Sequence, residues 1–369
     1  MYKIWRKVTG HYLIYISVLF FILLIILTVT LLKPAELLTA HQIYNNCKTQ
    51  AIREPCYMLE FRKLTQNKNL NYITNVLSLL QTIDPQAEKC HYIAHSIARA
   101  EVLQNVNGWK EILKTVDVTT CAEGFLHGVI EAKIGSKNIT TSPKEISDLC
   151  TQVDKGSRLE YGCSHIMGHF ILVDSYPSIP NALKTCDEIS KSNTQTFKEE
   201  CYAGVFMEYS DRGNLEAHHI TTLPNKTVEF ANSYKQTCLS YEGLQGRACW
   251  KILGRLYAPV LNANPQDIFK ACNQAPNEEY KWYCYLRAAA MMPQTPGFKQ
   301  ENFKDICTQF NDAEKFSICN QFVIDGLLGV SVTYKPMLLS YCKELTSKDQ
   351  ETCYNTIQNY TADSIKKWQ

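Results

Sequence analysis

Cysteines recur in pairs along most of the chain, and their spacing constrains the fold more strongly than any other feature. The 369-residue sequence has sixteen cysteines, and fourteen of them form seven pairs whose members are 9 to 15 residues apart. The second cysteines at positions 249, 284, 319 and 353 follow one another at intervals of 35, 35 and 34 residues. A nearly fixed period of this length is typical of helical repeat proteins. The seven pairs are Cys47/Cys56, Cys150/Cys163, Cys186/Cys201, Cys238/Cys249, Cys272/Cys284, Cys307/Cys319 and Cys342/Cys353.

Each repeat is predicted to be a pair of helices. The first cysteine of a pair closes a helical segment, as in residues 268–272, and the second opens another helix, as in residues 249–257. One such unit cannot bury its apolar face alone, so the units are expected to stack into an all-α, α/α solenoid. A disulfide within each pair would tie the end of one helix to the start of the next. A loop this short contributes about 2–3 kcal/mol.

Cys90 and Cys121 do not belong to this series. Both open helices, and the helical segments that precede them, residues 72–83 and 109–118, contain no cysteine. The simplest completion is a Cys90–Cys121 disulfide across two adjacent helices, which gives eight disulfides in total. It requires the two helix starts to converge. The alternative is that both side chains stay as thiolates and bind a metal.

Two dipeptides in residues 249–257 resemble a known repeat motif. With Leu253–Gly254 and Leu256–Tyr257, the chain resembles the Sel1-like branch of the tetratricopeptide superfamily, mainly over residues 238–353. The resemblance implies a helical solenoid used for binding, and it does not imply an enzyme. Secreted cysteine-rich members of that branch also link each repeat with a disulfide, although the cysteine spacing is wider here.

Residues 12–32 contain no charged side chain, and a helix of this length spans about 30 Å, the thickness of a bilayer core. Lys3, Arg6 and Lys7 precede them, which places residues 1–11 in the cytoplasm. The alternative is a cleaved signal peptide, but no small-x-small cleavage site follows closely. We therefore predict a single-pass signal anchor, and an extracellular or periplasmic location for the rest of the chain, where disulfides form.

The predicted organisation is a linker at residues 33–46 and an extracytoplasmic repeat domain at residues 47–369. Residues 90–174 form its histidine-rich part, and residues 186–369 form its regular cysteine-paired part. The formal net charge is +2, without the clustered basic face of a nucleic-acid-binding protein. The expected partners are the membrane and a protein or peptide on the concave face of the solenoid.

Five of the nine histidines lie in three consecutive predicted helices, which begin at the cysteines at 90, 121 and 163. Residues four apart share one face of a helix. Each of the three helices therefore presents a set of ligand-type side chains on one face, and neighbouring helices should align these sets into two rows. No other repeat has a histidine at the corresponding positions. The sets are His91 and His95; Glu123, His127 and Glu131; His165 and His169.

Imidazole and carboxylate groups bind transition metals, and i,i+4 spacing places two ligands on one helix face. The pattern predicts a bound zinc, iron or copper ion held by these seven residues. An open coordination position would allow a metal-dependent hydrolase or oxidoreductase, with Glu131 as the candidate general base. The other interpretation is a metal-free scaffold in which the histidines bond neighbouring helices. The sequence does not decide between a binding protein and an enzyme.

Overall fold

The regular secondary structure of the computed structural model is helical throughout the part of the chain that it describes. The described residues are 35–84, 87, 90–115, 121, 123–135, 150, 158–175, 178–191, 193–211, 227–295, 298–330, 334–345 and 347–358. These residues form seventeen α-helices and three short 3-10 helices, and they contain no strand. The predicted membrane segment, residues 12–32, lies outside them. Among the described helices, none combines the length and the apolar character needed to cross a bilayer.

The odd-numbered helices form one continuous row, in which each helix packs against the next. Most even-numbered helices pack beside their odd-numbered neighbours. The row consists of α3 (Glu54–Thr65), α5 (His91–Gln104), α7 (Gly124–Gly135), α9 (Arg158–Ser175), α11 (Gln195–Ser210), α13 (Gly243–Val260), α15 (Glu278–Met291), α17 (Ala313–Val330) and α19 (Ser347–Gln358). The others are α2 (Ala35–Cys47), α4 (Leu70–Ile83), α6 (Trp109–Thr115), α10 (Ile179–Ile189), α12 (Val228–Cys238), α14 (Pro265–Cys272), α16 (Phe303–Ile306) and α18 (Lys335–Cys342).

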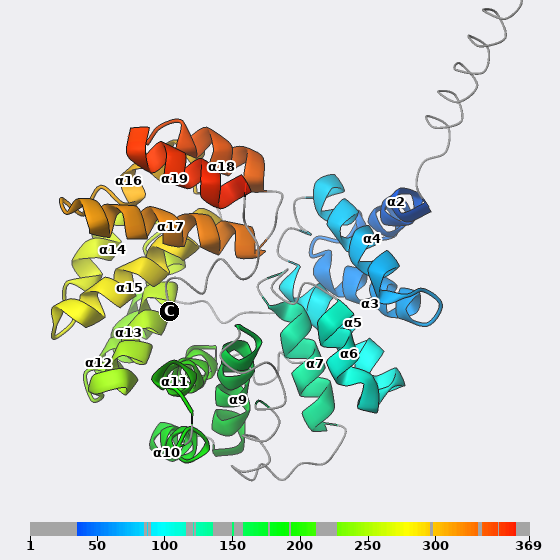
Figure 1. Cartoon of the computed structure of the whole chain (residues 1–369), viewed down its shortest axis with the longest axis horizontal. Helices are drawn as coiled ribbons and strands as arrows, with labels where there is room; N and C mark the ends of the chain where they lie inside the picture. Colours follow the sequence, from blue (N-terminus) through cyan, green and yellow to red (C-terminus); the bar gives the residue numbers. More distant parts are fainter. Residues whose placement is uncertain are drawn as a thin grey trace, which may run out of the picture.

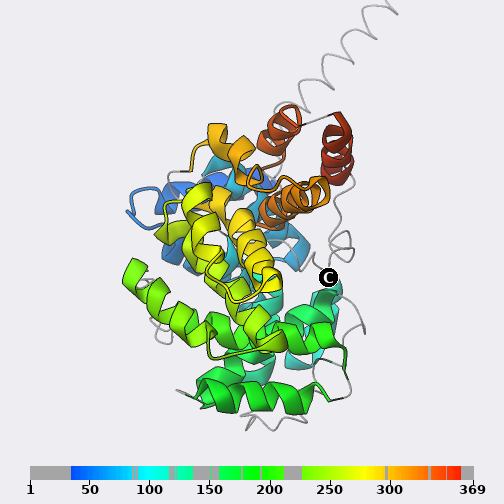
Figure 2. The same cartoon turned by 90° about the vertical axis from the view of Figure 1, so that its left-hand side faces the viewer.

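The helices follow a curved path around a central region (Figure 1). The green helices α9–α11 lie at the bottom of the view, and the red helices α18 and α19 lie at the top. The view turned by 90° keeps this order (Figure 2). One apolar core runs along the whole path, from Ala40 in α2 to Ile357 in α19. The fold is therefore repeat-like, since each unit is buried mainly by its neighbours.

All sixteen cysteines are paired, and the eight disulfides join the partners that the spacing predicts. Cys90 is bonded to Cys121, so the thiolate alternative for these two residues is wrong. The other seven bonds are Cys47–Cys56, Cys150–Cys163, Cys186–Cys201, Cys238–Cys249, Cys272–Cys284, Cys307–Cys319 and Cys342–Cys353.

The positions of the cysteines within the helices agree with the prediction only in part. The first cysteine is the last residue of α2, α12, α14 and α18, as expected. The prediction that the second cysteine opens its helix is wrong. Cys56 is the third residue of α3, after Glu54 and Pro55, and Cys319 is the seventh residue of α17, which begins at Ala313. The second cysteine is also the seventh residue of α11, α13, α15 and α19.

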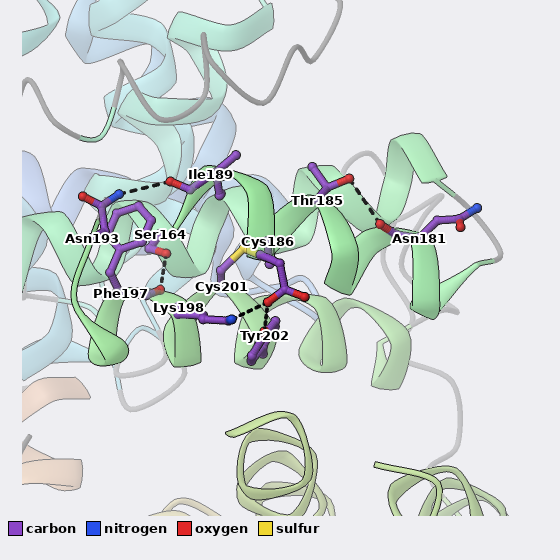
Figure 3. The surroundings of a disulfide bond; sticks show 11 residues. Ser164, Asn181, Thr185, Cys186, Ile189, Asn193, Phe197, Lys198, Cys201 and Tyr202 are labelled. Carbon is purple, nitrogen blue, oxygen red and sulfur yellow. Dashed lines mark hydrogen bonds and ion pairs between the residues drawn. A yellow bond between two sulfur atoms is a disulfide. The ribbon is translucent and has the colours of Figure 1, made fainter. Parts of the chain in front are cut away.

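Helix α11 shows why these helices begin before the cysteine. Thr194 is its N-cap, and the Thr194 hydroxyl accepts a hydrogen bond from the backbone N–H of Phe197 at 3.2 Å. Beside the Cys186–Cys201 disulfide, Lys198 forms a 2.5 Å salt bridge to Asp187 of α10 (Figure 3). The first turns of α11 are thus held by a cap and an ion pair as well as by the disulfide.

The predicted linker at residues 33–46 is helical from Ala35 onward, as part of α2. Ala40 and Ile43 are buried, and α2 packs against α3 and α4. The apolar side chains of this segment therefore belong to the first helical unit.

Candidate functional site

The five predicted histidines come together in one cluster. His91 and His95 come from α5, His127 from α7, and His165 and His169 from α9. The His127 ring lies at the centre, because its centroid is 5.0 Å from that of His91, 6.4 Å from His95, 6.3 Å from His165 and 5.7 Å from His169. The His165 and His169 centroids are 5.0 Å apart. We call these five rings the imidazole cluster. The two separate rows predicted from helical phase are in fact joined through His127.

Glycines in the neighbouring helices bring the histidine-bearing backbones close together. A Cβ atom added at Gly124 or Gly128 of α7 would lie 2.2 Å from the carbonyl oxygen of His91 or His95 of α5, respectively. A Cβ at Gly204 of α11 would lie 1.9 Å from the carbonyl oxygen of His165. No side chain fits in these contacts, so the glycines set the helix spacing on which the imidazole cluster depends.

The contact at Gly204 gives a testable prediction for stability. We expect Gly204→Ala to lower the free energy of unfolding by about 2 kcal/mol, because forcing α9 and α11 apart outweighs the roughly 1 kcal/mol helix preference of alanine. Chemical denaturation followed by circular dichroism measures this change. Gly243→Ala measures backbone strain alone, since Gly243 has a left-handed φ of +57° and nothing within 4 Å of an added Cβ. If Gly204→Ala stabilises the protein by about 1 kcal/mol, as alanine does at an unhindered helical position, the close contact is not needed.

Carboxylates from adjacent helices pair with three of the five histidines. His95 Nε2 lies 2.8 Å from Glu131 Oε2, so the candidate general base is within hydrogen-bond distance of a histidine. His169 Nδ1 lies 2.8 Å from Glu208 Oε2, and His165 Nδ1 lies 3.5 Å from Glu200 Oε2. Each of these pairs joins one odd-numbered helix to the next. The histidine–carboxylate pairs therefore link α5 to α7 and α9 to α11.

Glu123 directly precedes α7, which begins at Gly124. Burial lowers the pKa of His165 and the Glu123 carboxylate opposes this effect, so Glu123 lies near the imidazole cluster. Glu123 has a φ of +66° and Cys121 a φ of +60°, both in the left-handed region that non-glycine residues rarely adopt. The disulfide to Cys90 and a 3.2 Å contact between His91 Nδ1 and the Cys121 carbonyl hold this segment. The carbonyl of Glu123 accepts the backbone hydrogen bond of His127 at 3.0 Å.

Burial decides the protonation state at the centre of the cluster. Desolvation, reinforced by the four surrounding imidazoles, holds the pKa of His127 well below its ordinary value of 6.5. Desolvation also lowers the pKa of His165. Both rings are therefore neutral at pH 7, which is the form that binds metals. Although burial alone would raise it, Lys251 and His165 hold the pKa of Glu200 well below its usual range.

Four further polar residues lie next to the cluster, and the two acidic ones, Glu200 and Asp211, were not among the predicted ligands. Glu200 precedes Cys201, so it was left out when α11 was expected to begin at that cysteine. Lys251 Nζ lies 2.7 Å from Glu200 Oε1, and Arg255 donates to Asp211 at 2.9 Å. Lys251 and Arg255 follow Cys249 by two and six residues, the same offsets at which His165 and His169 follow Cys163. That correspondence places Lys251 and Arg255 beside the histidines.

Glu208 is a further carboxylate at the cluster that was not among the seven predicted ligands. Its side chain is only 6% exposed and pairs with His169.

The described residues contain no group of three or more His, Cys, Asp or Glu side chains that is arranged to hold a metal ion. One detail nevertheless matches a metal ligand. His169 Nε2 is buried without a hydrogen-bond partner, while its Nδ1 is held by Glu208. Metal-binding histidines usually have this arrangement, in which a carboxylate fixes the nitrogen that does not bind the metal.

Compared with family models, with curated proteins and with solved structures, the chain matches none of them.

Proposed function

We propose that the chain is a membrane-anchored, extracytoplasmic binding protein built as a Sel1-like helical solenoid, which binds a transition metal at the imidazole cluster. The eight disulfides support an oxidising compartment, and the uncharged residues 12–32 support the anchor. The continuous row of odd-numbered helices supports the solenoid. The main support for a bound metal is the packing of four imidazole rings around the neutral, partly buried His127.

His127, His165 and His169 are the best candidates for the ligands. Two imidazoles that share a tetrahedral zinc, with each nitrogen about 2.0–2.1 Å from the metal, have ring centroids about 5 Å apart. The three centroid separations here are 5.0, 5.7 and 6.3 Å, so they are close to this value. Because the nitrogens do not yet converge, coordination requires the rings to turn. A bound zinc, iron or copper would supply Lewis-acid or redox chemistry, and Glu208 would orient His169.

The three histidine–carboxylate pairs favour a second candidate function, a metal-free scaffold. In this case the pairs tie α5 to α7 and α9 to α11, and they keep the curved surface rigid for a protein or peptide partner. Loss of one histidine would then weaken the fold, while metal ions would have no effect on it. The two functions therefore predict opposite results for metal addition.

Metal analysis of the full chain tests the proposal. The protein is purified in mild detergent without chelator or histidine tag, and its metal content is measured by mass spectrometry. We expect about one ion per chain, and a melting temperature that rises when Zn²⁺ or Cu²⁺ is added to chelator-treated protein. Absence of a stoichiometric metal, together with an unchanged melting temperature, would favour the metal-free scaffold.

Variants at two histidines separate a ligand from a structural role. His127→Ala should abolish metal binding and leave the helical circular dichroism signal unchanged. His41→Ala, at an exposed histidine of α2, is the matched control and should bind metal as the wild type does. If His127→Ala loses its fold as well as its metal, the histidine has a structural role.

A further inference from the structure

Arg287 is a cation inside the row of odd-numbered helices that no described carboxylate approaches to ion-pair distance. It lies on α15, three residues after the buried Cys284, and it is only partly exposed. Its Nε atom is buried and has no hydrogen-bond partner. Over the described part of the chain, Arg287 also forms no salt bridge and no side-chain hydrogen bond. A guanidinium stays charged at any pH at which the protein is folded, and among the described residues only the longer-range charges of Glu200 and Glu123 offset it.

Two further cations lie on the neighbouring helix α13. Lys251 and Arg255 are four residues apart and therefore share one face. Helices α13 and α15 are in backbone contact at Gly254, where an added Cβ would lie 2.0 Å from the carbonyl oxygen of Cys284. On α13, Arg255 is the residue after Gly254. On α15, Arg287 lies about one helical turn after Cys284. The close contact thus brings the three side chains together, and we call them the cation triad.

Two of the three carboxylates near the triad, Glu200 and Asp211, are already paired with its other two members. Glu200 pairs with Lys251 at 2.7 Å, and Asp211 pairs with Arg255 at 2.9 Å. Burial lowers the pKa of Arg287, and the charge of Arg255 lowers it further, against a smaller opposing effect of Glu200 and Glu123. The environment of Arg287 is therefore unfavourable for a positive charge unless an anion is present. An unpaired charge inside a protein is strongly destabilising.

We propose that the cation triad binds a small oxyanion, a phosphate or carboxylate group, with Arg287 as its main contact. The planar guanidinium offers two parallel N–H donors, which match two oxygens of such a group better than a lysine does. Glu200 contacts both Lys251 and His165, so the anion site lies next to the imidazole cluster. The cation triad needs no bound metal to hold an anion, so the anion site is independent of metal binding at the imidazole cluster.

Thermal unfolding of the full chain in mild detergent with excess chelator tests the anion site without a metal. Sodium phosphate and sodium succinate are added separately, and sodium chloride at the same ionic strength is the reference. We expect phosphate or succinate to raise the melting temperature by a few degrees above chloride, and the more effective ion identifies the group that the site prefers. If neither ion exceeds chloride, the site does not exist.

The variant Arg287→Gln tests whether Arg287 binds the anion that raises the melting temperature. The variant should lose the shift, and in chloride it should be at least as stable as the wild type, because an unpaired charge has been removed. Lys270→Gln, at an exposed position on α14, is the matched control and should keep the full shift. A shift retained by Arg287→Gln would place the anion elsewhere. A variant that is several degrees less stable in chloride would show that the protein itself satisfies Arg287. Either result overturns the proposal.

Discussion

Replacing Cys90 and Cys121 together with serine should lower the free energy of unfolding by about 4 kcal/mol, the largest effect expected for any one disulfide of this chain. The bond closes a loop with a sequence separation of 31, whereas the other seven separations lie between 9 and 15. A longer loop restricts the unfolded chain more strongly, so its closure contributes more stability. The matched control is Cys272→Ser with Cys284→Ser, at a separation of 12, which should cost about 3 kcal/mol.

The Cys90–Cys121 bond also has a local effect that the control bond lacks. It holds Cys121 in a left-handed conformation just before α7, and Glu123 shares this conformation. Without the bond, these two residues can relax, and His91 then loses its contact with the Cys121 carbonyl. Denaturant unfolding of the oxidised variants measures the difference. Equal losses in the two double variants would mean that loop length and this segment add nothing to the stability.

The regular part of the fold could be predicted from the sequence because the disulfides impose it locally. Cys238 and Cys249, for example, are close in sequence, so one helix end and the following helix must meet wherever the rest of the chain lies. Helix starts were less predictable. Thr194 begins α11 well before Cys201, and α17 likewise begins six residues before Cys319, because a cap residue is a weaker signal than a cysteine. At Cys56 the error is smaller, since α3 begins only two residues earlier.

The sequence predicted which histidines lie together, but it did not predict which carboxylates contact them. Helical phase correctly selected His91, His95, His127, His165 and His169, because each helix presents its i,i+4 residues on one face. The phase argument did not foresee the left-handed backbone of Glu123 just before the helix begins. It also could not find Glu200 or Glu208 as partners, since both come from the next helix and their contacts depend on how closely α9 and α11 approach at Gly204.

Acid should destabilise this protein at a higher pH than carboxylate titration alone would do, because of His127. Its pKa is lowered in the folded state by burial and by the surrounding imidazoles, while the unfolded chain has the ordinary value of about 6.5. Below pH 6.5 the unfolded chain therefore binds a proton that the folded chain does not bind. The free energy of unfolding then falls by up to roughly 1.4 kcal/mol per pH unit. The lowered pKa of His165 acts in the same direction.

Urea unfolding between pH 7.5 and 5.0 measures this slope, with chelator present so that metal binding does not contribute. Glu200 does not interfere in this window, because a lowered carboxylate pKa costs stability only below the unfolded value of about 4.3. His127→Gln should remove about 2 kcal/mol of the loss between pH 7.5 and 5.0, whereas His41→Gln should leave it unchanged. A wild-type stability that is flat down to pH 5 would mean that His127 takes up its proton in the folded protein. The imidazole cluster would then hold a positive charge at its centre, which is unfavourable for a metal ion, and the metal proposal would lose its main chemical support.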